Sequence, residues 1–139
     1  MKLVVVLLAL LLSSKTHSQP TYACFENDKN TKLRLWVLFD KNEKAKYIKY
    51  EGQKDSIQLI HSHLEQSKNP GGIPAVYWSE TYLEKFKGKI TGEYTFTNAG
   101  TRQLDVTYTR KKDGKQYYFR IIESFFDEVT GVFKETPCF

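Results

Sequence analysis

The stretch TYTRKKDGKQYYFR, residues 107–120, decides the fold of this chain. It places Asp113-Gly114 between two segments in which apolar and polar residues alternate. Asp-Gly in that setting is the strongest short-range signal of a β-hairpin with a two-residue type I′ turn. Counting outward from the turn predicts three cross-strand pairs on one side of the sheet: Arg110 with Tyr117, Tyr108 with Phe119, and Val106 with Ile121.

A second hairpin is predicted just before the first. If Asn98-Ala99-Gly100 is a three-residue loop with Gly100 in the left-handed region, Tyr94 faces Leu104 and Ile90 faces Tyr108. Gly92 then faces Val106, where a missing side chain lets a curved sheet bend. The two turns together predict one shared apolar face: Ile90, Tyr94, Phe96, Leu104, Val106, Tyr108, Phe119 and Ile121.

The basic residues of the opening stretch lie around the predicted turn tip, where solvated charge is expected. A nucleic-acid surface would instead place aromatic and basic side chains together on one exposed face. Only Tyr118 and Arg120 form such a combination here. We therefore expect no nucleic-acid partner.

Upstream segments show the same period of two. Residues 32–39, 45–50 and 56–62 alternate in hydropathy and are separated by turn residues, which is typical of an antiparallel meander. Residues 56–68 and 79–87 also fit short helices, so both alternatives stay open there, with a strand favoured up to Ser62. Residues 66–74 contain two prolines and a Gly-Gly pair and predict a loop.

A last strand is expected within residues 129–135, where it would bring the C-terminus beside the first strand and close the sheet. About seven or eight antiparallel strands result. The fold class predicted is therefore all-β, a single small antiparallel barrel or sandwich, because closure removes exposed strand edges.

Residues 1–18 have the pattern of a secretory signal peptide. Lys2 precedes an apolar run from Leu3 to Leu12, which is too short to span a bilayer as a helix, and cleavage is expected before Gln19. The predicted mature domain, residues 19–139, has 19 basic and 16 acidic residues, a formal net charge of +3. We expect a secreted or periplasmic protein without a membrane span.

Both cysteines, Cys24 and Cys138, belong to the predicted mature domain. An even, small number of cysteines in an exported chain favours a disulfide, and only one intramolecular pairing exists here. A metal site or catalytic thiol is disfavoured, because the two cysteines lie far apart and neither belongs to a CxxC pair.

His61, His63 and Glu65 are the candidate metal ligands. On a strand they would share one face and offer two imidazoles and a carboxylate. The competing interpretation is a polar strand end that runs into a loop, and it is the one we favour. No cofactor is therefore expected. The local motifs of common hydrolases are absent, which argues against an enzyme. A metal-assisted enzyme that uses these three residues stays an alternative, because catalytic groups can converge from distant strands without a local motif.

Exposed aromatic residues supply the candidate binding surface. Trp36 lies opposite the apolar face of residues 33–39, so it is either covered by other parts of the protein or lines a recognition surface. Candidate ligand or partner contacts on such a surface are Trp36, Leu38, Trp78, Tyr118 and Arg120.

Two resemblances accompany these features. An exported antiparallel barrel of this length, with a terminal disulfide and a glycine bend at Gly92, looks like a small lipocalin-type binder. The start Tyr22-x-Cys24 and the stretch from Phe96 to Gly100 resemble the periplasmic inhibitors of c-type lysozyme. We predict a non-enzymatic module that binds a small ligand or a protein, with a protein inhibitor or adhesion module as the alternative.

Overall fold

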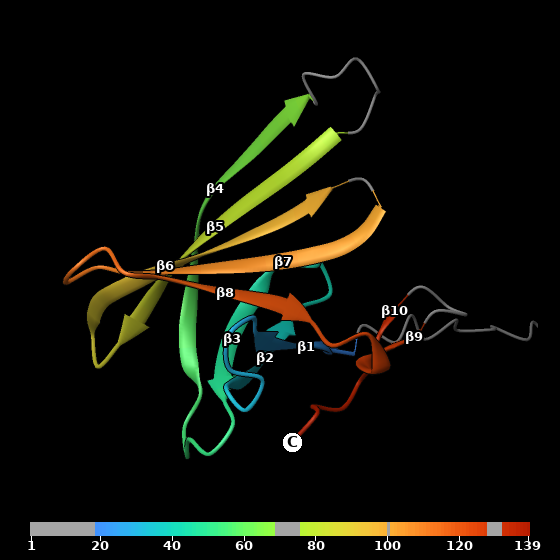
Figure 1. The fold of residues 1–139 in the computed structure, drawn as a ribbon, viewed down its shortest axis with the longest axis horizontal. Helices are drawn as coiled ribbons and strands as arrows, with labels where there is room; N and C mark the ends of the chain where they lie inside the picture. The colour runs from blue at the N-terminus through green and yellow to red at the C-terminus, as the bar shows by residue number, and fades with distance from the viewer. Residues whose placement is uncertain (1–18, 69–75, 100, 128–131) are drawn as a thin grey trace, which may run out of the picture.

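The computed structural model describes residues 19–68, 76–99, 101–127 and 132–139, so the predicted signal peptide lies outside the described residues. Eight antiparallel strands close into a barrel (Figure 1), which confirms the predicted all-β fold. The strands are β1 (Thr21–Asn27), β2 (Arg34–Phe39), β3 (Ala45–Tyr50), β4 (Ile57–Lys68), β5 (Val76–Phe86), β6 (Lys89–Ala99), β7 (Thr101–Arg110) and β8 (Gln116–Ile121).

Each strand pairs with the next one along the chain, and β8 returns to β1, where Phe25 lies opposite Ile121. The expected C-terminal strand is therefore not the one that closes the barrel. A 3-10 helix (Glu123–Phe125) leads into a separate two-stranded sheet of β9 (Phe126–Asp127) and β10 (Val132–Phe133). This segment touches the barrel edge where the Tyr22 amide donates to the Lys134 carbonyl, at 2.7 Å, because β8 covers only the second half of β1.

The disulfide between Cys24 and Cys138 is present, with a Cα–Cα distance of 6.3 Å. Cys24 belongs to β1 and is buried. Together with the Tyr22–Lys134 bridge it attaches the C-terminal segment to the first strand, as the positions of the two cysteines predicted.

Both segments that also fitted helices are strands. β4 continues to Lys68, past the predicted end at Ser62, and pairs with β5 along its length. Figure 1 shows the distal parts of β4 and β5 extending away from the first three strands. Pairing with a neighbouring strand outweighs the local helical pattern here, because strand preference depends on such contacts.

The core fills the middle of the barrel with inward-facing apolar side chains. Of the predicted shared face, Tyr94, Phe96, Val106 and Phe119 are buried there, and Tyr108 and Ile121 are partly buried and pack against the core. The side chain of Leu104 lies outside the described ones. Ile90 is an exception, because it lies past a β-bulge opposite Lys85. The buried core consists of Ala23, Phe25, Leu35, Val37, Phe39, Ala45, Ile48, Ile57, Leu59, Tyr82, Tyr94, Phe96, Val106 and Phe119.

The register of the β7–β8 hairpin differs from the predicted one by two residues. Tyr108 lies opposite Tyr117, and Val106 lies opposite Phe119. The predicted type I′ turn is wrong, because Gly114 has a positive φ of 68° and Asp113 does not. A longer loop forms instead, in which the Gly114 amide donates to the Arg110 carbonyl at 2.8 Å.

The register of the β6–β7 hairpin is also different. Tyr94 lies opposite Tyr108, and Gly92 lies opposite Arg110 rather than Val106. Ala99 pairs with Thr101, so the connection is tighter than the predicted loop, and an irregularity in β7 takes up the extra residues. Both register errors are even numbers of residues, and therefore the same side chains still face inward.

Gly114→Val is expected to destabilise the protein by about 1 to 3 kcal/mol, the range for a residue held in a sparsely populated backbone region. Nothing lies within 4 Å of the position of an added Cβ, so the cost comes from the backbone alone. Lys112→Val in the same exposed loop is the matched control and should cost much less. Equal thermal shifts for the two variants would contradict the role given to the positive φ.

Candidate functional site

A cavity of about 390 Å³ opens at one end of the barrel. The turns β1–β2, β3–β4, β5–β6 and β7–β8 surround this end, since the strands are antiparallel and joined in sequence order. The apolar and aromatic wall is formed by Leu33, Tyr50, Ile57, Phe86, Tyr117 and Phe119. The polar lining is formed by Gln53, Glu84, Thr91, Tyr108 and Arg110.

Glu84 is a buried carboxylate that lines this cavity, with only 6 % of its surface exposed. It accepts three hydrogen bonds from hydroxyl groups. Thr91 and Tyr108 donate to its Oε1 at 2.6 and 2.9 Å, and Tyr94 donates to its Oε2 at 2.8 Å. Such bonds offset the cost of removing a carboxylate from water.

Two features of β6 bring these hydroxyls to Glu84. A β-bulge leaves Thr91 without a partner on β5, between Gly92, which faces Glu84, and Ile90, which faces Lys85. Bulges of this kind re-aim a side chain. Gly92 has no side chain, and the Tyr108 ring occupies that space, 2.4 to 2.7 Å from where a Cβ would lie. The glycine therefore lets Tyr108 of β7 reach across β6 to a carboxylate on β5.

The tyrosine hydroxyls of this network are held in their protonated form. Burial raises the pKa of Tyr94 far above its ordinary value, and the nearby Tyr50 and Glu84 raise it further. Burial also raises the pKa of Tyr108, with its hydrogen bond to Glu84 as the next cause, and burial raises the pKa of Tyr50. The hydroxyls of Tyr50 and Tyr94 lie 2.8 Å apart, which extends the network to β3.

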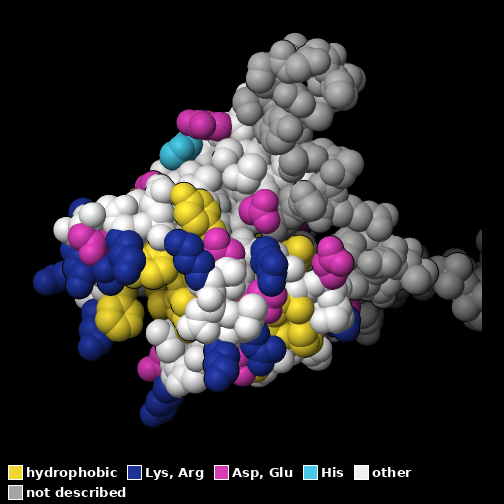
Figure 2. Space-filling view, in the orientation of Figure 1, with side chains coloured by type: hydrophobic (Ala, Val, Ile, Leu, Met, Phe, Trp, Pro, Cys, Tyr) yellow, Lys and Arg dark blue, Asp and Glu magenta, His cyan; other side chains and the backbone are white. Residues whose placement is uncertain are grey.

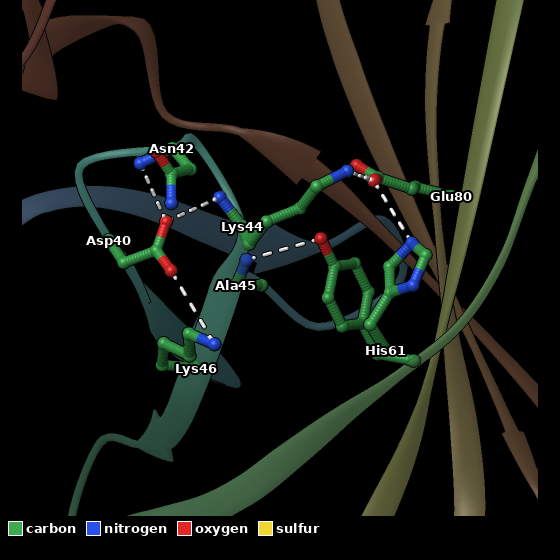
Figure 3. A network of polar contacts seen from close by, with 8 residues as sticks. Asp40, Asn42, Lys44, Ala45, Lys46, His61 and Glu80 are labelled. Carbon is green, nitrogen blue, oxygen red and sulfur yellow. Dashed lines mark hydrogen bonds and ion pairs between the residues drawn. The ribbon is translucent and has the colours of Figure 1, made fainter.

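The other end of the barrel contains a separate polar network (Figure 3). Glu80 contacts Lys44 and the His61 ring, whose Nε2 lies 3.1 Å from Glu80 Oε1. The Tyr82 hydroxyl beside it accepts a hydrogen bond from the Ala45 amide at 3.1 Å. These contacts tie the β2–β3 connection to β4 and β5.

Burial, together with the neighbouring Glu80, raises the pKa of Tyr82 to about 12. A tyrosine whose pKa is higher in the folded state stabilises the fold below its ordinary pKa and loses that contribution as the pH rises. We therefore expect the free energy of unfolding to fall between about pH 10 and pH 12. Urea unfolding across this range would measure it, and Tyr82→Phe should show a smaller decrease. An identical decrease in both proteins would contradict the assignment to Tyr82.

Basic side chains surround the mouth of the cavity. In Figure 2 Lys and Arg side chains gather around hydrophobic ones at the left of the molecule, the side where the β5–β6 and β7–β8 turns lie in Figure 1. Arg110 is paired with Asp113, at 2.6 Å between Nη2 and Oδ2, and this bond lowers the pKa of Asp113 to about 2. Lys115 lies over the Tyr117 ring, 5.2 Å from its centroid.

The structure gives the candidate metal ligands His61, His63 and Glu65 different partners. A β-bulge in β4 lies between His61 and His63, so the regular alternation that would place them on one face is interrupted. His61 contacts Glu80, whereas His63 contacts Ser62 and lies 3.7 Å from Glu65. Among the described residues, no group of three histidine, cysteine or acidic side chains is arranged to hold a metal ion.

The predicted surface residues are distributed over three strands. On β2, Trp36 is half-buried and packs edge-on against Tyr22, with ring centroids 5.2 Å apart, and Leu38 is half-buried two residues further on. Trp78 on β5 is 45 % exposed. On β8, Tyr118 is 49 % exposed and Arg120 forms an ion pair with Glu26, at 3.0 Å.

Sequence reasoning missed Glu84 and the hydroxyls around it. One partial signal exists: a strand over residues 76–86 places Glu84 on the same face as Tyr82, and Tyr82 is buried in the core. Because residues 79–87 also fitted a helix, the alternation of a strand did not single out Glu84. The hydroxyl partners come from other strands and carry no local pattern.

None of the helices in the described part of the chain is long and apolar enough to cross a membrane. Comparison of the chain with protein-family models, with curated proteins and with solved structures gave no match.

Proposed function

We propose that this protein is a secreted, non-enzymatic binding protein that holds a small ligand in the cavity beside Glu84. The observation that carries the proposal is the cavity itself. It has a largely apolar and aromatic wall and a few converging polar groups, which are the ordinary features of a small-molecule site, and its volume lies within the usual range.

The position of the core supports a site at the mouth rather than a channel through the barrel. Phe25, Phe39 and Phe96 are buried in the middle, and their rings pack edge-on with centroids 6.1 to 6.3 Å apart. The ligand would rest on this packed centre. A closed sheet around the site favours binding, because little conformational freedom remains to be lost.

The disulfide supports an oxidising, extracellular-type environment, since such bonds persist mainly there. Secretion is the simplest route to such an environment for a chain that begins with an 18-residue signal-like segment.

Fluorescence of the neutral apolar probe N-phenyl-1-naphthylamine would test the proposal. Ile57 is buried in the cavity wall, so Ile57→Trp places an indole ring in the ligand space. Gln58→Trp is the matched control, because Gln58 is the next residue and is exposed. We expect saturable binding to the wild type and to Gln58→Trp, with at least about a tenfold loss for Ile57→Trp, as for a ligand that loses a well-packed contact. Equal binding by both variants would place the probe elsewhere and refute the proposal.

A further inference from the structure

We infer that the ligand carries an ammonium group that binds the Glu84 carboxylate. This inference rests on the proposed function, because it names the chemical class of ligand for the same cavity. Three properties of the described residues support it: the direction of the hydrogen bonds, the remaining acceptor capacity of Glu84 and its charge.

The hydrogen bonds of the network all run toward Glu84. A carboxylate only accepts, so Thr91, Tyr94 and Tyr108 must each use their single hydroxyl hydrogen on it. The Tyr94 hydrogen is then already committed, and Tyr50 must donate its own to the Tyr94 oxygen. This network therefore offers acceptors to a ligand and no hydroxyl hydrogen.

Glu84 also retains capacity to accept. A carboxylate has about four lone-pair positions. Two on Oε1 are taken by Thr91 and Tyr108, and one on Oε2 is taken by Tyr94, so Oε2 has one position left. Because Glu84 lines the cavity, a donor on a ligand is the group that fits there.

The charge of Glu84 is not matched by a cation in the described part of the chain. The ion pairs there join other residues, and Arg110, which also lines the cavity, is paired with Asp113. Burying an unpaired charge is costly, and a positively charged ligand would offset that cost. Tyr50, Tyr117 and Phe119 supply aromatic wall for the apolar part of such a ligand, and aromatic rings attract cations.

The lysines at the mouth raise the opposite possibility of an anionic ligand. Lys111, Lys112 and Lys115 are exposed, and their attraction is weakened by solvent and salt. An anion that entered the cavity would meet the Glu84 carboxylate and a network without free hydroxyl hydrogens. The inner site therefore favours a cation.

Isothermal titration calorimetry with three ligands of similar shape would test the inference: 2-phenylethylamine, 2-phenylethanol and 3-phenylpropionate. At neutral pH these are a cation, a neutral molecule and an anion. We expect the wild type to bind the amine at least about tenfold more tightly than the alcohol, as for a hydrogen bond to a charged group. This comparison needs no variant.

Two substitutions test whether Glu84 causes the preference for the amine over the alcohol. Glu84→Gln keeps the shape of the side chain and removes its charge, and should reduce the preference for the amine over the alcohol to within about threefold. Glu80→Gln is the matched control, because Glu80 belongs to the polar network at the other end of the barrel. It should leave the preference of the wild type unchanged.

The possible failures are distinguishable. Tightest binding of 3-phenylpropionate, or equal binding of amine and alcohol, would overturn the ammonium inference while leaving a ligand cavity in place. An unchanged preference in Glu84→Gln would overturn it as well. If neither these three compounds nor N-phenyl-1-naphthylamine binds, the proposed function fails together with the inference.

Discussion

Removing the disulfide by the double substitution Cys24→Ala and Cys138→Ala is expected to lower the free energy of unfolding by about 4 to 5 kcal/mol. The bond joins residues separated by 114 positions, and so it removes much of the freedom of the unfolded chain. Cross-links that close long loops have the largest effect of this kind. A loss of that size is a large share of the stability of an ordinary domain.

Urea unfolding of the oxidised wild type and the double variant would measure this effect. The wild type unfolded with a reducing agent present is the control, and its stability should fall to that of the variant. Alanine is the better replacement at Cys24, which is buried, since serine would add a buried hydroxyl. A difference below about 1 kcal/mol would contradict the expectation that the bond restricts the unfolded chain.

Gly92→Ala is expected to lower the free energy of unfolding by about 2 to 6 kcal/mol, the sum of two effects. The added Cβ would overlap the Tyr108 ring, with the nearest ring atom at 2.4 Å, and overpacking costs about 1 to 3 kcal/mol. Moving the ring also disturbs the hydrogen bond from Tyr108 to the buried Glu84, which adds about 1 to 3 kcal/mol.

A double-mutant cycle with Tyr108→Ala separates these causes from a general effect of alanine in a strand. The Tyr108→Ala variant has no ring in the space next to residue 92. Adding Gly92→Ala to that variant should therefore lower the free energy of unfolding only slightly. The double variant should therefore be clearly more stable than the sum of the two single effects predicts, which corresponds to a large coupling free energy between the two positions. Additive effects of the two substitutions would show that the ring does not need the glycine.

Parts of the fold followed from local patterns. The alternation in residues 32–39 predicted one apolar face of Leu33, Leu35, Val37 and Phe39. The last three are buried, and Leu33 is half-buried and packs against the core. Asp113-Gly114 marked a real hairpin, although the loop is longer than the two-residue turn. The prediction of inward and outward side chains stays correct despite such register errors, because a shift by an even number of residues leaves every side chain on its own face.

The candidate site did not follow from local patterns. Its carboxylate is on β5, its hydroxyl donors are on β6 and β7, and Tyr50 on β3 completes the network. The pairing that brings them together depends on a bulge at Thr91 and on the tight β6–β7 connection. A β-bulge shifts the register between two strands by one residue, and no local sequence pattern around Thr91 predicted the bulge.

The amino-acid sequence by itself determined the all-β class, the alternation of inward and outward side chains and the Cys24–Cys138 pairing. The first two follow from a period of two along each strand, and the third from having only two cysteines. The tertiary structure alone decided the register, the closure of β1 on β8 and the cavity around Glu84. These depend on which residues of distant strands meet, and that is settled by packing over the whole barrel rather than by any one segment.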